Sequence, residues 1–91
     1  MKEILINCEK IRSRKVFHDY LEETLSLPDY YGRNLDALHN ILAAHNRTDP
    51  VSFRLINREK QSTRMVDMYD ALIVMLRQLH EENPNISLTE E

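Results

Sequence analysis

The chain has 91 residues and a formal net charge of -3, with 42% hydrophobic and 30% charged residues, the composition of one small globular domain. The negative charge argues against a general nucleic-acid binder, and no apolar run is long enough to span a bilayer. A lone Cys8 excludes an intrachain disulfide, and the N-terminal apolar run is too short for a secretory signal. We expect one domain over residues 1–91, located in the cytoplasm, without membrane contact and with Cys8 as a reduced structural thiol.

The first segments of the chain indicate a strand followed by a helix. Glu3–Asn7 is a short apolar run without alternation, which is typical of a strand buried on both faces of a parallel sheet. Ser13 can cap the N-terminus of a helix that ends before Pro28, because proline disfavours helical backbone at Leu27. The apolar face of this predicted helix comprises Phe17, Tyr20, Leu21 and Leu25.

A loop and a second helix follow Pro28. Gly32, the only glycine, can adopt a positive φ in this loop. Asn34 is a strong N-cap whose side-chain oxygen can accept a hydrogen bond from the backbone N–H of Asp36 or Ala37, so the helix starts at about Leu35. Its apolar face comprises Leu35, Leu38, Ile41 and Leu42. The opposite face presents Asp36, His39, Asn40 and Ala43.

The rest of the chain predicts a strand, a long helix and a closing strand. Residues 46–50 form a turn, and the strand Val51–Ile56 alternates, which indicates one more exposed face and suggests a position at a sheet edge. Residues 57–62 form either a short helical turn or an irregular link. The longest helix runs from Thr63 or Arg64 to Glu82, with methionines as core filler, and the last strand is Asn85–Thr89. Residues 90–91 should fray.

This order of elements predicts the fold class α/β: a single small domain with a three-stranded parallel sheet packed with three to four helices. Parallel strands require helical crossovers, which are right-handed in nearly all known cases.

Residue patterns for catalysis or cofactor binding are missing from the sequence. One glycine cannot form a Gly-rich phosphate loop, and the four histidines have no metal-ligand spacing. We therefore expect no cofactor, no metal and no catalytic residue. The adjacent Tyr30 and Tyr31 admit two interpretations, either a cap over the core or a recognition surface, and at least one of them should be exposed.

The segment from Leu27 to Leu38, Leu-Pro-Asp-Tyr-Tyr-Gly-Arg-Asn-Leu-Asp-Ala-Leu, resembles the signature segment of the barstar family of ribonuclease inhibitors. Weaker similarity runs from Met1 through Ile11, and the order of elements matches to the C-terminus. The resemblance implies a barstar-like fold and a monomer that occludes the active site of a cognate ribonuclease in a 1:1 heterodimer. It also suggests a cis peptide bond between Asp49 and Pro50, since family members carry a proline at the entry to this strand.

The resemblance also implies a partner-binding surface on the loop and the second helix, with a contact on the last helix. The candidate residues are Tyr30, Tyr31, Gly32, Arg33, Asn34, Leu35, Asp36, His39, Asn40, Ala43, His45 and Gln78. Four of them depart from the family's pattern: His39 replaces a tryptophan, while Asn40, Gln78 and Arg33 replace acidic residues. These departures suggest a partner other than barnase itself.

Two functions follow from these residues. The first is an intracellular inhibitor or immunity protein against a ribonuclease toxin, with Asp36 as a charged anchor and the tyrosines as stacking groups. The alternative is a barstar-like interaction domain that binds a non-ribonuclease toxin or a regulatory partner. A small enzyme or an RNA binder is the least supported.

Overall fold

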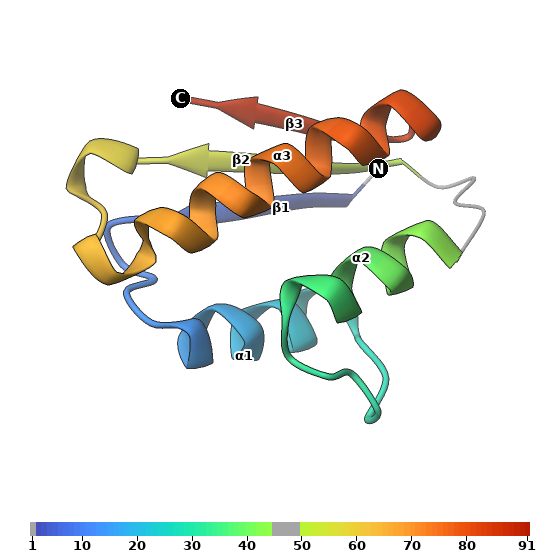
Figure 1. Cartoon of the computed structure of the whole chain (residues 1–91), viewed down its shortest axis with the longest axis horizontal. Coiled ribbons are helices and arrows are strands. Elements are labelled where there is room, and N and C mark those ends of the chain that lie inside the picture. Colours follow the sequence, from blue (N-terminus) through green and yellow to red (C-terminus); the bar gives the residue numbers. More distant parts are fainter. Residues whose placement is uncertain (1, 45–49) are drawn as a thin grey trace.

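The computed structural model describes residues 2–44 and 50–91, apart from the side chain of Ala44 (Figure 1). Its elements are β1 (Lys2–Asn7), α1 (Arg14–Leu25), α2 (Leu35–Ala44), β2 (Val51–Ile56), η1 (Arg58–Lys60), η2 (Thr63–Met65), α3 (Val66–Glu82) and β3 (Ile86–Glu90). This order confirms the predicted α/β class. The polar link after β2 contains a short 3-10 turn, the first of the two predicted alternatives.

The three strands form one parallel sheet in the order β1-β2-β3. In the register, Phe53 pairs with Ile4 on one side and with Leu88 on the other. The parallel pairing is confirmed, and so is the more exposed face of Val51–Ile56, because buried and half-buried residues alternate along β2. The suggested edge position is wrong, because β2 is central. Its alternation reflects an open sheet face and not an open edge.

One face of the sheet is covered by the helices and the other is open. Figure 1 shows α3 crossing the sheet while α1 and α2 lie alongside β1. Ile4, Ile6 and the inward residues of β2 are fully buried, whereas Leu5 between them is 41% exposed. The prediction that the first strand is buried on both faces is therefore wrong: β1 is apolar at Leu5 without being covered there.

Both predicted helix caps are present. The Ser13 side chain accepts a hydrogen bond from Val16 N at 3.2 Å, and Asn34 Oδ1 accepts one from Ala37 N at 2.7 Å. α1 ends at Ser26, whose left-handed backbone (φ 53°) turns the chain out of the helix and into the loop. These caps place the two ends of loop 26–34, which carries five of the twelve candidate residues.

α3 supplies much of the core. Its buried side chains are Met68, Tyr69, Leu72, Ile73, Met75, Leu76 and Leu79. The fully buried Tyr69 donates its hydroxyl proton to the Ile11 carbonyl at 2.8 Å, and Cys8 is fully buried. Within the described residues, no helix is long and apolar enough to cross a membrane.

The C-terminal residues are ordered, which corrects the prediction that they fray. Glu90 belongs to β3 and forms ion pairs with Arg77 at 2.6 Å and Arg58 at 3.6 Å. Glu91 pairs with Arg54 on the open face of the sheet. His45, the predicted turn over 46–49 and the Asp49-Pro50 bond lie outside the described residues.

Candidate partner-binding surface

Loop 26–34 turns its two tyrosines in opposite directions. Tyr30 is 84% exposed, while Tyr31 is 6% exposed and belongs to the hydrophobic core. The prediction that at least one is exposed is confirmed. As a candidate contact residue, however, Tyr31 is corrected: its ring is packed inside, so Tyr30 alone offers an aromatic surface to a partner.

The Tyr31 hydroxyl has a buried polar partner. It shares a hydrogen bond with Nδ1 of His18 at 2.7 Å, and the two rings meet edge to face with centroids 5.5 Å apart. Burial raises the pKa of Tyr31 to about 12. Burial, followed by the positive charge of Arg33, lowers the pKa of His18 below its ordinary value. Which of the two groups donates depends on the tautomer of His18.

The positive φ of the loop falls on Arg33 and not on Gly32, which corrects the prediction. Arg33 has a φ of 56°, whereas Gly32 does not have a positive φ. Close packing explains the glycine, because a Cβ at Gly32 would lie 3.3 Å from Cβ of Ala37. A side chain at position 32 would therefore crowd the first turn of α2.

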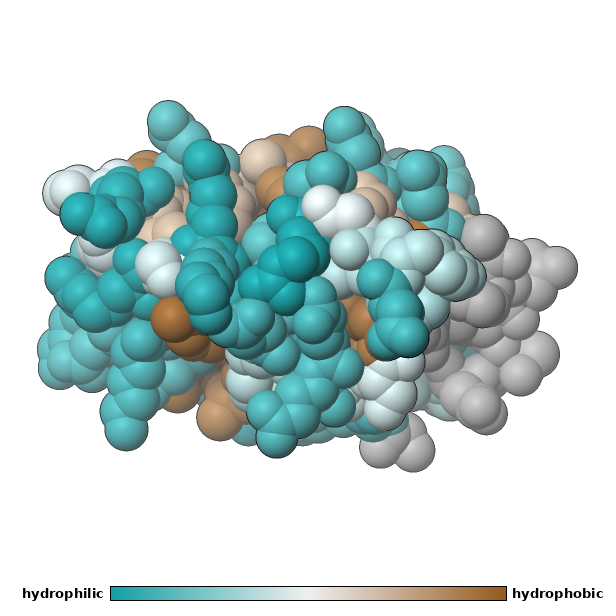
Figure 2. All heavy atoms as spheres, turned by 90° about the horizontal axis from the view of Figure 1, so that it is seen from below, coloured by the Kyte–Doolittle hydropathy of each residue, from teal (hydrophilic) through white to brown (hydrophobic). Residues whose placement is uncertain are grey.

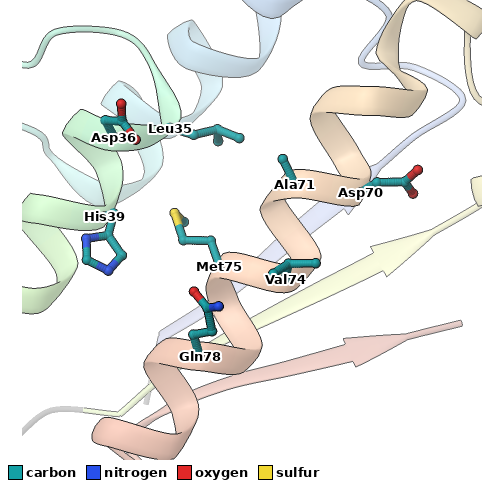
Figure 3. A pocket seen from close by; sticks show the side chains of 8 residues that line it. All are labelled: Leu35, Asp36, His39, Asp70, Ala71, Val74, Met75 and Gln78. Atoms are coloured by element: carbon teal, nitrogen blue, oxygen red, sulfur yellow. The ribbon is translucent and has the colours of Figure 1, made fainter.

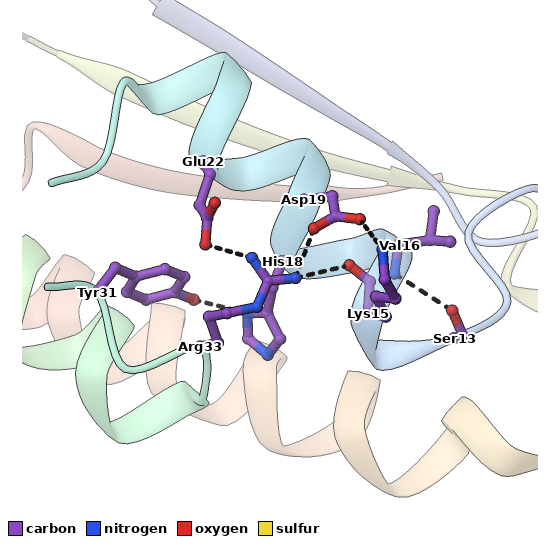
Figure 4. A network of polar contacts seen from close by, with 8 residues as sticks. All are labelled: Ser13, Lys15, Val16, His18, Asp19, Glu22, Tyr31 and Arg33. Carbon is purple, nitrogen blue, oxygen red and sulfur yellow. Dashed lines mark hydrogen bonds and ion pairs between the residues drawn. The ribbon is translucent and has the colours of Figure 1, made fainter. Parts of the chain in front are cut away.

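The Arg33 side chain is bound within the protein (Figure 4). Its Nη1 pairs with Glu22, and its Nη2 pairs with Asp19 at 2.5 Å and donates to the Lys15 carbonyl at 3.2 Å. Hydrogen bonds from Lys15 and Arg33 lower the pKa of Asp19, and those to Asp19 and Glu22 raise the pKa of Arg33. Arg33 is therefore engaged with α1 instead of being free for an acidic partner.

The face of α2 that presents Asp36, His39, Asn40 and Ala43, called the α2 face below, is exposed as predicted. Asp36, Asn40 and Ala43 are exposed and His39 is half-buried, while Leu38 and Leu42 on the opposite face are fully buried. Asp36 lies in the first turn of α2, where its negative charge meets the positive end of the helix dipole. Among the residues that the structure describes, Asp36 forms no ion pair. Its carboxylate is therefore available to a cation of a partner.

A groove of about 560 Å³ separates α2 from α3 (Figure 3). Asp36 and His39 line it from α2, and Asp70, Val74 and Gln78 line it from α3. Its lining also includes the apolar Leu35, Ala71 and Met75. Asp70 lies at the edge of the groove, where its side chain points away from α2 in Figure 3 and its carboxylate pairs with Arg58 at 2.9 Å. The groove thus combines an apolar floor with the carboxylate of Asp36 on its α2 side.

A smaller hollow of about 240 Å³ lies on the other side of α2. Tyr30, Gly32 and Asn40 contribute to it, together with Tyr31, Ala37 and Ile41. The face that carries α1, loop 26–34 and part of α2 is mostly hydrophilic, with small separate hydrophobic spots (Figure 2). Such a surface favours recognition by charge and hydrogen bonds over recognition by a large apolar patch.

The described residues contain no group of three or more His, Cys, Asp or Glu side chains that could hold a metal ion. What the surface offers instead is one exposed tyrosine, the carboxylate of Asp36 beside a groove, and hydrogen-bonding side chains at His39, Asn40 and Gln78. These groups can bind a protein surface that presents cations and hydrogen-bond donors.

The predicted surface divides into three parts in the structure. Leu35, Asp36, His39 and Gln78 meet at the groove, whereas Tyr30, Gly32 and Asn40 meet at the smaller hollow. Arg33 is bound to α1, Asn34 caps α2, and Ala43 is exposed farther along the α2 face.

Sequence reasoning placed Gln78 at the surface but missed Asp70 and Val74 on the same wall of the groove, and it missed the buried His18. Asp70, Val74 and Gln78 follow one another at intervals of four along α3, a spacing that places them on one stripe. His18 stands between the apolar Phe17 and the charged Asp19, so the sequence already indicates that it lies at the boundary of the apolar face of α1.

The fold defines a small α/β domain with a three-stranded parallel sheet. A family model described as "Barstar (barnase inhibitor)" matches residues 1–89, and the chain belongs to this family. It is also 34% identical over 82 residues to a protein of Bacillus subtilis (strain 168) named "Putative ribonuclease inhibitor YrdF". That alignment covers 90% of this chain and 89% of the relative.

Proposed function

We propose that this protein is a non-enzymatic inhibitor that acts in the cytoplasm as an immunity protein, by binding a cognate ribonuclease toxin and covering its active site in a 1:1 complex. The observation that carries the proposal is the exposed carboxylate of Asp36, beside the groove, in a chain of the barstar family. Ribonucleases that bind RNA phosphate with Arg, Lys or His present cations that a carboxylate can pair with.

The contact surface consists of Tyr30, the α2 face and the groove. Tyr30 supplies exposed aromatic area, and tyrosine is enriched among residues that dominate binding energy. In the groove, the apolar floor accommodates the aliphatic stem of an arginine or lysine while Asp36 attracts its charge. His39, Asn40 and Gln78 add hydrogen bonds around this contact.

The neutral side chains favour one alternative, a toxin or regulatory protein that is not a ribonuclease. Asn40 is exposed and Gln78 lines the groove, so neither adds negative charge to the surface. A partner with a less basic surface would match this pattern better than a nuclease site that must bind RNA phosphate.

Inhibition assays test the proposal. Cleavage of a fluorogenic RNA by several small ribonucleases, one of them barnase-type, is measured against increasing concentrations of the protein. We expect stoichiometric loss of cleavage for a cognate enzyme, and loss of that inhibition in the variant with Tyr30→Ala and Asp36→Asn. Glu81→Gln is the matched control, because it removes one exposed charge outside the groove. A 1:1 complex that still cleaves RNA at the full rate would favour the alternative.

A further inference from the structure

We infer that Arg33 is a positioning residue, which fastens loop 26–34 to α1 and so fixes the orientation of Tyr30 and of the first turn of α2. Its three acceptors are the carbonyl of Lys15 and the carboxylates of Asp19 and Glu22. They stand at positions i, i+4 and i+7 and therefore lie on one stripe of α1. We call these three contacts the Arg33 clamp.

The clamp uses both terminal nitrogens of the guanidinium. Nη1 donates to the carboxylate of Glu22, and Nη2 donates to both the carboxylate of Asp19 and the carbonyl of Lys15. The planar fork of arginine holds several acceptors in a fixed arrangement, which the single ammonium of lysine does not. Asp19 is itself held in place, because Lys15 Nζ binds its second oxygen at 2.8 Å. The acceptor side is therefore an organised pair of carboxylates on a rigid helix.

A second attachment lies two residues earlier in the loop. Tyr31 is buried against His18 on α1, with the 2.7 Å hydrogen bond between them. Two side chains within three residues thus bind the same helix, one in the interior and one at the surface (Figure 4). Tyr30 next to them is left in solvent, which is where a contact residue must be.

The backbone at Arg33 needs these contacts. Its φ of 56° lies in the left-handed region, which residues other than Gly, Asn and Asp rarely adopt. Asn34 follows directly and caps α2 through Ala37 N. The clamp therefore fixes the turn that leads into the helix carrying Asp36. An ordered loop loses less conformational entropy when a partner binds.

The clamp is a property of the free protein, whereas its effect on binding rests on the proposed function. Amide hydrogen exchange tests the first part, because Tyr31 N donates to the Pro28 carbonyl at 3.0 Å within the loop. Arg33→Asn removes the guanidinium and keeps a residue that tolerates a positive φ. A second variant, Asp19→Asn with Glu22→Gln, removes the charged acceptors and leaves the loop sequence unchanged. Arg77→Asn, which removes the remote pair with Glu90, is the control.

We expect both clamp variants to speed exchange of the Tyr31 amide by roughly three- to tenfold, with the Phe53 amide in the central strand unchanged. Arg33→Lys should be intermediate, and high salt should move the wild type toward the variants. Unchanged exchange at Tyr31, or equal acceleration at Tyr31 and Phe53, would overturn the positioning role.

The binding part is tested with a ribonuclease that the wild type inhibits. Arg33→Asn should weaken inhibition about tenfold through lost loop order, and Asp19→Asn with Glu22→Gln should weaken it similarly. Faster exchange of the Tyr31 amide together with unchanged inhibition would overturn this part. If the wild type inhibits no ribonuclease, the proposed function fails while the exchange result still decides the clamp.

Discussion

The hydroxyl of Tyr31 lies 2.7 Å from Nδ1 of His18, so a residue of the loop shares a buried hydrogen bond with a residue of α1. Both side chains are nearly excluded from solvent. Removing one partner of such a pair leaves the other buried and unsatisfied.

Tyr31→Phe should therefore destabilise the protein by about 1–3 kcal/mol, since Nδ1 of His18 loses its partner. Urea unfolding measures the change. Tyr20→Phe is the matched control, because it removes a hydroxyl that donates to the Leu5 carbonyl in an exposed position. We expect a smaller loss there. Equal losses in the two variants would show that the buried pair carries no special stabilisation.

Stability should fall as the pH is lowered below about 6.5, the ordinary pKa of histidine. Burial and the charge of Arg33 lower the pKa of His18 in the folded protein. Between the folded and unfolded pKa values the unfolded chain binds more protons, so acid favours unfolding. Urea unfolding from pH 7.5 to 5 measures this trend, and His18→Gln should flatten it. If stability still falls with pH in His18→Gln, the pH dependence comes from other titratable groups.

The proposed contact surface should be separable from the core. Tyr30→Ala and Asp36→Ala should keep the melting temperature within a few °C, since Tyr30 is in solvent and Asp36 loses only a dipole contact of less than about 1 kcal/mol. Leu38→Ala on the buried face of α2 should cost about 2–5 kcal/mol by leaving a cavity.

Thermal melting beside affinity for an inhibited ribonuclease checks this separation. Each of the two surface variants should lose upward of about 2 kcal/mol of binding energy. If both surface variants melt early, or if both bind like the wild type, the contact surface lies elsewhere.

The sequence predicted the elements well because each carries a local signal. The caps at Ser13 and Asn34 and the alternation in β2 depend on neighbours within a few residues. The order of the strands in the sheet does not depend on such neighbours, which is why the suggested edge position of β2 was wrong. The periodicity of a strand reports which faces are covered and not how many neighbours the strand has.

The surface was harder to predict because it depends on contacts between elements. Tyr30 and Tyr31 are adjacent and identical, so only the packed loop decides which is buried. Arg33 finds its acceptors 11 and 14 residues earlier on α1, at Glu22 and Asp19. The groove requires α3 to pack beside α2, and no local pattern predicts its width.

The last prediction concerns charge at Asn40 and Gln78. Asn40 is exposed on the α2 face, and Gln78 lines the groove with Asp36 and Asp70. We expect the wild type to inhibit a barnase-type enzyme only weakly, because these two positions add no charge to meet basic catalytic residues. The variant with Asn40→Asp and Gln78→Glu should inhibit at least about tenfold better, mainly through faster association at low salt.

The control for this prediction adds the same charge at positions far from the proposed contact surface. Ser52→Asp with Thr89→Glu places two carboxylates on β2 and β3, at positions that point to the open face of the sheet. Because charges farther apart than about 10 Å are screened at 0.1 M salt, this control should not improve inhibition. Inhibition curves for the three proteins at 0.05 and 0.3 M salt decide the matter. Nanomolar inhibition by the wild type, or equal gains in both variants, would show that local charge at Asn40 and Gln78 does not set specificity.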